Sequence, residues 1–432
     1  MVNKELIKQI IVSNQENIGL FDLIERETEL PIDSGKIITV PGVRRCGKSS
    51  LLMLAIKKLL AKGIETKRIL LFNFDDERLK FDNTNLESII SAYRELYVDV
   101  NLRDIYIFFD EIQIVDGWQS FVRRIYEQDC PNIFLTGSNS KMLSSELASS
   151  LRGRSLQYEE YPLSFREMCL FRGVSTNIYS PKAQASLSNL FDEYMIYGGF
   201  PEVVMAKDVL KDRILTDYFY VMLYRDLVEH FNINPITTAR YFIQRVMENL
   251  TKPTSINKIF NEMKSLGISI GKDKVYSLTD QCESIYLFIP LHCYTNSVQR
   301  SLSSEKKFYC IDVGLRKQIL RPQSDDKGKI LENIVFLELY RNLSQSENLS
   351  YYKGHTECDF VLSEMGQVNK LIQVCWDVSD QSTLDREVNG LVEASKNTSC
   401  DQMYIITHDI ENEISTQTGA IHIIPAWKWC LI

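Results

Sequence analysis

The stretch 36–49 constrains the fold of this chain more than any other, because its residue types and their spacing suit one task. A short apolar, β-branched run from Ile37 to Val40 ends in Pro41, and the sequence Gly42-Val-Arg-Arg-Cys-Gly-Lys-Ser49 follows. This order matches G-x-x-x-x-G-K-S/T, the pattern of a loop that binds phosphate between a strand and a helix. The sequence therefore predicts a strand, a phosphate-binding loop and a helix in succession.

The chemistry of this loop follows from its side chains. The glycines let the backbone curl so that successive N–H groups point at one anion. Lys48 is expected to reach the β- and γ-phosphates, and the Ser49 hydroxyl to ligate Mg²⁺. The apolar run after Ser50 predicts a helix whose N-terminal dipole faces the phosphates. ATP and Mg²⁺ are therefore the expected ligands. The predicted nucleotide-binding residues are Gly42, Val43, Arg44, Arg45, Cys46, Gly47, Lys48, Ser49 and Ser50.

A second motif follows where the apolar run 105–109 ends in Asp110 and Glu111. A strand that ends in Asp-Glu, downstream of a phosphate loop, is typical of a Walker B element. The end of the strand would place Asp110 near the Mg²⁺ and Glu111 near the attacking water. We therefore expect Asp110 to share the metal with Ser49, and Glu111 to activate the water.

The next apolar run, 132–136, leads into Gly137-Ser138-Asn139-Ser140. A polar side chain at the tip of a strand beside both earlier motifs can hydrogen-bond the γ-phosphate or the water. Asn139 and Ser138 are both eligible for this sensor role, and the sequence does not separate them. Ser138 or Ser140 also suits the N-cap of a helix expected to begin near Lys141, and this role could hold in parallel.

Two arginines follow in Leu151-Arg-Gly-Arg-Ser155. An arginine presented to the γ-phosphate of a neighbouring subunit stabilises the charge of the transition state. Arg154, immediately before a predicted strand, is the first candidate for this role, and Arg152 is the second. A plain surface position is the alternative. Action in trans would require a homo-oligomer.

Several stretches together resemble a prokaryotic AAA+ type ATPase family in which the ATPase is joined to a C-terminal domain of unknown function. They are Gly42–Ser49, Asn73–Leu79, Phe109–Gln113, Leu135–Ser140, Leu151–Arg154, Tyr161–Phe165 and Tyr197–Glu202. The resemblance covers nearly the whole chain. It implies an additional-strand P-loop core, hydrolysis of ATP, and the arginine after Gly153 as the finger. It implies no agreed biological role.

The alternation of short apolar runs with amphipathic stretches from 36 to 172 predicts βα units and a mostly parallel sheet. The runs are Lys36–Val40, Arg68–Phe74, Ile105–Phe109, Asn132–Thr136 and Ser155–Tyr158. The expected fold class is an α/β additional-strand P-loop sheet, in residues 1–172, with a helical lid in 173–240. A winged-helix module and a small α/β restriction-endonuclease-like domain are expected in 241–320 and 321–432.

The winged-helix prediction rests on the order of elements in 241–320. A helix from Ser255, a turn at Gly267 and a helix over Lys272–Asp280 precede strands over Glu283–Pro290 and Lys306–Ile311. Basic residues outnumber acidic ones between 240 and 317, although the whole chain has a net charge of −8. This local excess suits a surface that faces duplex DNA. Docking of a protein partner is the alternative.

The C-terminal residues 321–432 resemble a restriction-endonuclease-like core. Glu332 lies on a predicted helix, and Asp359 and Gln373 match the Asp and Glu/Gln that hold Mg²⁺ in such cores. Cys375 stands where the resemblance requires the lysine that activates water. A neutral thiol cannot replace that cation at a phosphodiester.

Lys353 or Lys370 could take over the role of the missing lysine, but a degenerate domain retained for binding or packing is the favoured interpretation. Two functions therefore compete for the whole protein. One is ATP hydrolysis that drives or gates a DNA-associated process, and the other is a nucleotide-gated switch that binds a protein. An ATP-coupled nuclease is the least favoured alternative.

Composition sets broad limits on these interpretations. The 432 residues allow two or three domains, and the hydrophobic and charged fractions are those of an ordinary globular protein. The ten cysteines form no C-x-x-C pair, which indicates reduced thiols in a cytoplasmic protein. No apolar stretch approaches the length of a membrane span, so no membrane association is expected.

Overall fold

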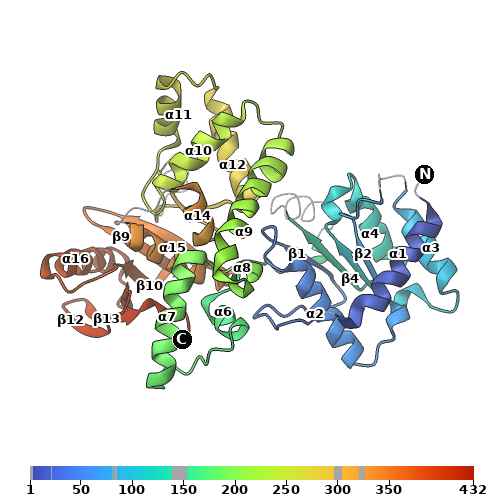
Figure 1. Ribbon diagram of the computed structural model, residues 1–432. Coiled ribbons are helices and arrows are strands. Elements are labelled where there is room, and N and C mark those ends of the chain that lie inside the picture. Colours follow the sequence, from blue (N-terminus) through green and yellow to red (C-terminus); the bar gives the residue numbers. More distant parts are fainter. Residues whose placement is uncertain are drawn as a thin grey trace. The chain divides into compact units, whose positions relative to one another are not determined.

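The computed structural model divides into two compact units (Figure 1). The first comprises Met1–Tyr161 with Ser284–Tyr286, and the second comprises Pro162–Glu283 with Leu287–Ile432. The structure describes residues 3–20, 22–79, 81, 85–138, 153–295, 304–320 and 326–432. Within these ranges, every helix is too short or too polar to cross a membrane.

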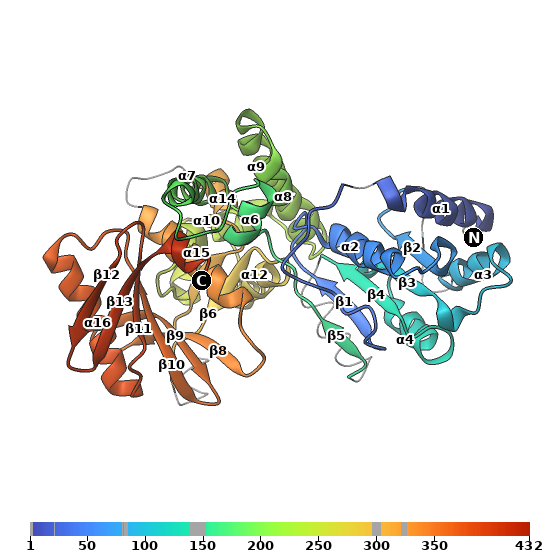
Figure 2. The same cartoon turned by 90° about the horizontal axis from the view of Figure 1, so that it is seen from below.

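The first unit is built on a five-stranded parallel sheet with the strand order β2-β3-β4-β1-β5. Its strands are β1 (Ile37–Pro41), β2 (Ile69–Asn73), β3 (Tyr106–Asp110), β4 (Ile133–Gly137) and β5 (Ser155–Gln157). β4 lies between β1, which leads into the phosphate loop, and β3, which ends in Asp110 (Figure 2). This inserted strand confirms the additional-strand P-loop fold predicted from the sequence.

Helices cover both faces of this sheet, which explains why its strands are continuous apolar runs. In β3, Ile107 and Phe109 join the core beneath α1, α3 and α4, whereas Phe108 joins the core beneath α2, because successive side chains point to opposite faces. The α-helices are α1 (Lys4–Asn17), α2 (Lys48–Ala61), α3 (Glu87–Leu96) and α4 (Trp118–Gln128). The 3₁₀ turns are Ile18–Leu20, Thr66–Arg68, Leu102–Asp104 and Ile112–Ile114.

The second unit begins with helices and a two-stranded antiparallel sheet. Its first elements are α6 (Phe165–Phe171), α7 (Pro181–Tyr197), α8 (Pro201–Met205), α9 (Asp208–Val221), a π-helical turn (Met222–Glu229), α10 (Ile236–Glu248), α11 (Ile256–Ser265), α12 (Lys272–Ser284), β6 (Phe288–Leu291), β7 (Lys307–Cys310) and α14 (Val313–Ile319). The strand predicted to start at Glu283 starts later, because α12 continues to Ser284. The winged-helix assignment and the boundaries at 172, 240 and 320 stay predictions.

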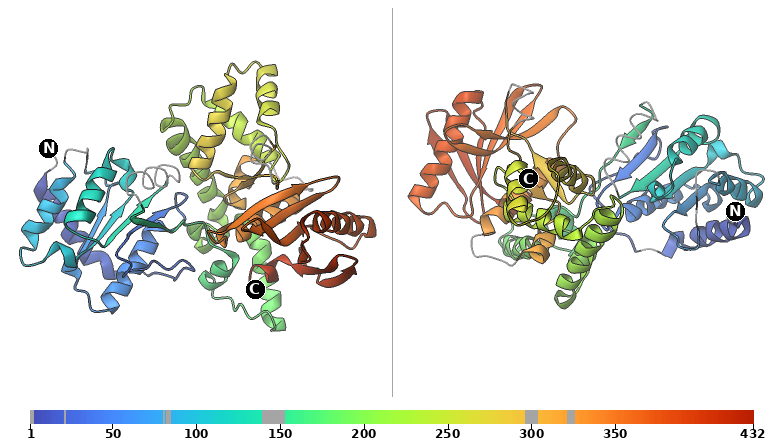
Figure 3. Two further views of the ribbon diagram at one scale, coloured as in Figure 1. Left: turned by 180° about the vertical axis from the view of Figure 1, so that it is seen from behind. Right: turned by 90° about the horizontal axis from the view of Figure 1, so that it is seen from above.

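A mixed sheet, coloured orange to red in Figure 3, completes the second unit. It has six strands in the order β12-β13-β11-β10-β9-β8. The elements are α15 (Lys327–Arg341), β8 (Glu347–Lys353), β9 (Glu357–Glu364), β10 (Gln367–Val374), α16 (Gln381–Thr398), β11 (Met403–Thr407), β12 (Asn412–Thr416), β13 (Gly419–Pro425) and α17 (Ala426–Trp429). β8, β9 and β10 pair antiparallel, and β10, β11 and β13 pair parallel. This sheet is the predicted C-terminal α/β domain.

Candidate functional site

Two glycines shape the phosphate loop between β1 and α2. Gly47, directly before α2, has φ 110°, a conformation that side chains with a Cβ rarely adopt. A Cβ at Gly42 would lie 2.2 Å from the carbonyl oxygen of Glu160, so any side chain there would collide with the backbone after β5. Both positions therefore require glycine for structural reasons, in agreement with the motif.

Lys48 is buried at the start of α2, and its ammonium group spans the loop. Its Nζ donates to the carbonyl oxygens of Gly42 and Val43, each at 3.1 Å, and to the Ser138 hydroxyl at 3.3 Å. The carboxylate of Glu111 lies 3.6 Å away. One cation thus meets the ends of β1, β3 and β4, where the carboxyl ends of parallel strands form one edge of the sheet.

Ser49 and Asp110, the predicted metal ligands, lie side by side. The Ser49 hydroxyl donates to Asp110 Oδ2 at 2.7 Å, and the Thr136 hydroxyl donates to Asp110 Oδ1. Burial raises the pKa of the Asp110 carboxyl, and these two hydrogen bonds oppose that shift. A hydroxyl and a carboxylate side by side are hard oxygen ligands of the kind that Mg²⁺ takes when phosphate oxygens and water complete its shell. The residues present therefore fit a magnesium ion bound with a nucleotide.

Glu111 is held in a left-handed backbone conformation, with φ 54° and ψ 39°, directly after β3. Its N–H donates to the Thr136 hydroxyl at 2.9 Å, and its carboxylate accepts from Ser138 Oγ at 2.8 Å and from Gln113 Nε2 at 2.5 Å. Burial raises the pKa of Glu111, but the Lys48 charge and these hydrogen bonds outweigh it and hold the pKa below its usual value. The carboxylate is therefore ionised at neutral pH and able to accept a proton.

Of the two predicted sensor residues, the structure describes Ser138. Ser138 lies between the Lys48 ammonium and the Glu111 carboxylate. Asn139 lies outside the described residues, as does Arg152. The choice between Ser138 and Asn139 therefore stays a prediction.

Arg154 lies away from the phosphate loop of its own chain. It pairs with Glu127 of α4 and directly precedes β5. Ser155 pairs with Ile37 at the start of β1, whereas the phosphate loop follows the end of β1. At about 3.3 Å per residue, the four steps from Ile37 to Pro41 separate the two sheet edges by about 13 Å. This geometry disfavours action of Arg154 in its own site, and a role in trans stays a prediction.

Sequence reasoning missed three residues that organise the site: Thr136, Gln113 and Arg26. Thr136 bonds both Asp110 and the backbone of Glu111, and Gln113 bonds the Glu111 carboxylate. Thr136 was detectable as the polar residue that ends an apolar run.

No local sequence pattern marks Arg26 as part of the site, because its partners are distant in the sequence. It donates to the carbonyl oxygens of Cys46 at 2.8 Å and Tyr161 at 3.0 Å, and it pairs with the buried carboxylate of Glu160 at 2.6 Å. Arg26 thereby fastens the phosphate loop to the segment after β5. Burial raises the pKa of the Cys46 thiol to about 11, so this loop cysteine stays protonated and packs as an apolar side chain.

Comparisons with known proteins agree with this geometry. Residues 34–169 match the model of the AAA domain family, and residues 188–326 match that of a domain of unknown function, DUF8612. An uncharacterized protein of Methanocaldococcus jannaschii is 34% identical over 442 residues, which cover 100% of this chain and 96% of that protein. The chain belongs to the AAA+ type P-loop ATPase family. An uncharacterized protein of Haemophilus influenzae is 29% identical over 401 residues, 92% of this chain and 95% of its own length.

Two solved structures show a distant likeness to this AAA+ protein. The Aeropyrum pernix ORC1 protein in complex with DNA aligns with a TM-score of 0.32 and 9% identity, covering 74% of this chain and 92% of that chain. Cdc6p from Pyrobaculum aerophilum aligns with a TM-score of 0.27 and 12% identity, covering 78% and 96%. Scores this low add no support to the assignment.

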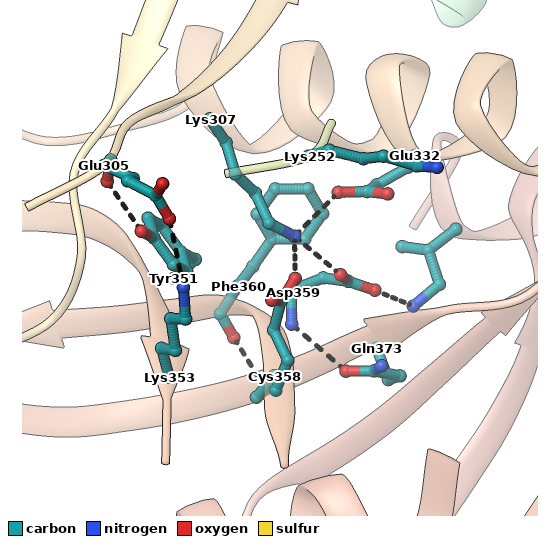
Figure 4. A network of polar contacts seen from close by, with 12 residues as sticks. Lys252, Glu305, Lys307, Glu332, Tyr351, Lys353, Cys358, Asp359, Phe360 and Gln373 are labelled. Atoms are coloured by element: carbon teal, nitrogen blue, oxygen red, sulfur yellow. Dashed lines mark hydrogen bonds and ion pairs between the residues drawn. The ribbon is translucent and has the colours of Figure 1, made fainter. Parts of the chain in front are cut away.

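The AAA+ protein also carries a buried ionic cluster in its C-terminal part, shown in Figure 4. Lys307 of β7 is 1% exposed, and its Nζ lies 2.9 Å from Asp359 Oδ1, 3.2 Å from Glu332 Oε1 and 2.7 Å from Glu357 Oε1. Burial alone would lower the pKa of Lys307, but these carboxylates hold it well above its usual value. The ammonium is therefore charged and compensates the acidic side chains around it.

The remaining residues of the predicted nuclease-like centre are engaged in the same region. Gln373 Oε1 accepts from the N–H of Asp359 at 3.1 Å, and its Nε2 donates to Glu387 at 2.6 Å. Burial raises the pKa of the Cys375 thiol to about 11, so it carries no charge. Gln373 thus positions the backbone beside Asp359, and Cys375 supplies no catalytic cation.

The lysines considered from the sequence do not fill the position of the missing cation. Lys353 pairs with Glu305 at 3.2 Å, and Lys370 is exposed on β10. The cation comes instead from Lys307, on a strand outside the C-terminal sheet. Because Lys307 is almost fully buried, its ammonium faces these carboxylates rather than solvent.

The basic excess predicted for 241–320 is partly internal. Lys307 lies in the cluster just described, and Arg316 is buried against Asp326 at 2.9 Å. Exposed lysines remain on the two helices before the hairpin: Lys258, Lys264, Lys272 and Lys274. α11 and α12 therefore carry four exposed lysines of this region.

Proposed function

We propose that this protein binds ATP with Mg²⁺ and hydrolyses it, and that hydrolysis drives or gates a DNA-associated process. The observation that carries the first part is the convergence of Lys48, Ser49, Asp110 and Glu111 at one edge of the parallel sheet. A cation, a hydroxyl, a metal-binding carboxylate and an ionised base within one hydrogen-bonded group suit phosphoryl transfer to water.

Each residue then has a defined task. Lys48 exchanges its carbonyl contacts in the loop for phosphate oxygens and neutralises their charge. Ser49 and Asp110 would hold Mg²⁺, which supplies a second positive charge to the phosphates when bound. Glu111 orients the attacking water and accepts its proton. Ser138, or Asn139 next to it, forms a hydrogen bond with the γ-phosphate.

The direct test is ATP turnover by the purified full chain, measured with Mg²⁺ and with EDTA. Steady turnover that requires Mg²⁺ is the expected result. Binding of ATP without any turnover, at several protein concentrations and with duplex DNA present, would restrict the site to nucleotide binding and favour the protein-interaction switch.

A further prediction concerns Arg154. If it acts on the site of a neighbouring copy, turnover per molecule should rise with protein concentration, because only the assembled form has complete sites. A mixture of Arg154→Ala and Lys48→Ala proteins should regain part of the activity that each lacks alone. The matched control is Glu127→Gln, which removes the observed partner of Arg154 and should leave turnover intact. Turnover independent of concentration, with no rescue on mixing, would assign Arg154 a structural role.

The DNA part of the proposal is supported by the exposed lysines of α11 and α12. Replacing both Lys272 and Lys274 with Gln should weaken duplex binding for all sequences alike. The slope of log affinity against log salt should become shallower by about 0.9 for each phosphate that the protein no longer neutralises. Fluorescence anisotropy at several salt concentrations, with a non-hydrolysable ATP analogue, measures both quantities. Absence of duplex binding at low salt would favour a protein partner for this region.

A further inference from the structure

Tyr286 reaches the first unit from a distant part of the chain. That unit comprises Met1–Tyr161 and also Ser284–Tyr286, whereas the residues on both sides of the short segment belong to the second unit. The Tyr286 side chain is only 4% exposed, and its hydroxyl donates to Glu159 Oε1 at 2.6 Å. Tyr286 therefore belongs to the surroundings of the segment that follows β5, within one compact unit.

The backbone at Tyr286 has a conformation in which glycine is usual. α12 ends at Ser284, and the N–H of Leu287 donates back to the carbonyl oxygen of Cys282 at 2.9 Å. Between them Tyr286 has φ 63°, the left-handed conformation of the residue that closes a helix in this way. Glycine takes this position most often, because a Cβ strains the backbone there. The turn alone therefore does not explain a tyrosine at this position, whereas its contact with Glu159 does.

Glu159 directly precedes the residue that touches the phosphate loop. The N–H of Glu160 donates to the carbonyl oxygen of Pro41 at 2.8 Å, and the carbonyl oxygen of Glu160 accepts from the Cys46 thiol at 3.4 Å. A Cβ at Gly42 would collide with that same carbonyl oxygen, so the loop and this segment pack directly against each other. A displacement of Glu159 would therefore reach the backbone of the loop.

The hydroxyl that contacts Glu159 stays protonated. Burial raises the pKa of the Tyr286 phenol well above its usual value, and the Glu159 charge raises it further. Tyr286 therefore remains a hydrogen-bond donor throughout the neutral range. The other carboxylate oxygen of Glu159 accepts from the Tyr161 hydroxyl. Two tyrosines thus fix the orientation of one carboxylate, and one of them comes from the chain that follows α12.

We propose that Tyr286 is a positioning residue of the nucleotide site. Its hydroxyl orients Glu159, Glu159 fixes the segment after β5, and that segment supports the phosphate loop in the shape that receives a nucleotide. The same hydrogen bond links the nucleotide site to the end of α12, which lies two residues before Tyr286 in the chain. This role rests on the proposed binding of ATP by the loop.

The first test uses Tyr286→Phe in the full chain, which keeps the ring and removes the hydroxyl. Binding of a fluorescent, non-hydrolysable ATP analogue with Mg²⁺ should weaken by about three- to tenfold, because the loop is less well pre-organised for the phosphates. Tyr126→Phe is the matched control: its hydroxyl donates to Gly35, before the start of β1, so the affinity should not change. Adding Tyr286→Phe to Glu159→Ala should cause no further loss, since the hydroxyl acts through that carboxylate.

Hydrogen exchange at the Leu287 amide separates positioning from plain stabilisation. In the wild-type chain, a saturating concentration of the analogue should slow this exchange several-fold, because a nucleotide that fixes the loop also fixes Tyr286 and the helix end beside it. In the Tyr286→Phe protein, the exchange rate should be the same with and without the analogue. A purely structural hydroxyl would instead change the rate equally in both conditions.

Three results would overturn this role for Tyr286. They are an unchanged affinity in Tyr286→Phe, additive losses in the double variant with Glu159→Ala, and exchange at Leu287 that responds equally to the analogue in both proteins. Absence of analogue binding by the wild-type chain is a different failure, because it would contradict the proposed ATP site itself and the role of Tyr286 with it.

Discussion

Replacing Glu111 with Gln should reduce ATP turnover by about 10²–10⁴-fold, the usual contribution of a general base, while ATP binding persists. Gln keeps the shape of the side chain and can still accept from Ser138, but it cannot take a proton from water. The lowered pKa of Glu111 means that the native base is ionised throughout the neutral range. Turnover by coupled phosphate release and binding of a fluorescent ATP analogue are the two measurements.

Two comparisons make this result specific. Lys48→Ala should lose ATP binding as well as turnover, because the β- and γ-phosphates lose the cation that faces them. Glu65→Gln, at an exposed position of the same unit, should change neither quantity. Full turnover by the Glu111→Gln protein would exclude Glu111 as the water activator, and loss of binding in the same protein would assign it to nucleotide contact.

Substituting Lys307 with Met should destabilise the C-terminal part of the protein by about 3–5 kcal/mol, the usual cost of removing one partner from a buried ion pair. The side chain is 1% exposed and faces Glu332, Glu357 and Asp359, so its loss leaves buried negative charges without compensation. Urea unfolding, with hydrogen exchange at the amides of β9 and β10, reports on this part of the chain. Lys353→Met is the matched control, since that lysine is exposed and should cost far less.

The same cluster predicts a dependence on pH. Burial and the Asp359 charge raise the pKa of Glu332 to about 7. A carboxyl whose pKa is raised by folding contributes stability that is complete below its unfolded pKa and is lost as pH rises through the folded value. Without the Lys307 charge, which lowers the pKa of Glu332, this carboxyl is harder still to ionise, so the defect of Lys307→Met should widen between pH 5 and pH 8. Adding Glu332→Gln should restore part of the lost stability.

Equal stability of the Lys307→Met and Lys353→Met proteins would contradict a compensating role for the buried ammonium. A defect that does not change with pH would show instead that lost packing, rather than uncompensated charge, accounts for the effect. Urea unfolding and hydrogen exchange of the Lys307→Met and Lys353→Met proteins at several pH values distinguish these two outcomes.

The sequence by itself determined the first unit well. The stretch Gly42–Ser49 specifies a turn at which the two glycines are required. Continuous apolar runs predict parallel strands that are covered on both faces, as the structure shows. The positive φ of Gly47 and the apolar character of each strand are local properties of the chain, which is why the sequence reveals them. The confirmed additional-strand sheet then brings Ser49 and Asp110 within 2.7 Å, because the carboxyl ends of its strands share one edge.

The sequence was a weaker guide wherever a boundary or a partner depended on distant residues. The strand expected from Glu283 does not begin there, because α12 continues for about one more turn and buries Cys282 and Ser284. The sequence correctly indicated that Cys375 carries no charge, but it offered Lys353 and Lys370 as substitutes. Among the described residues, neither Lys353 nor Lys370 forms an ion pair with Asp359.

Only the tertiary structure decided which lysine enters the acidic centre and which arginine supports the phosphate loop. Lys307 meets Asp359, and Arg26 meets Glu160, across long stretches of intervening chain. No local pattern marks such side chains, because Lys and Arg are ordinarily solvated on the surface. Their burial becomes favourable only when the folded backbone presents carboxylates and carbonyl oxygens that replace the lost water, and that arrangement exists only in the folded chain.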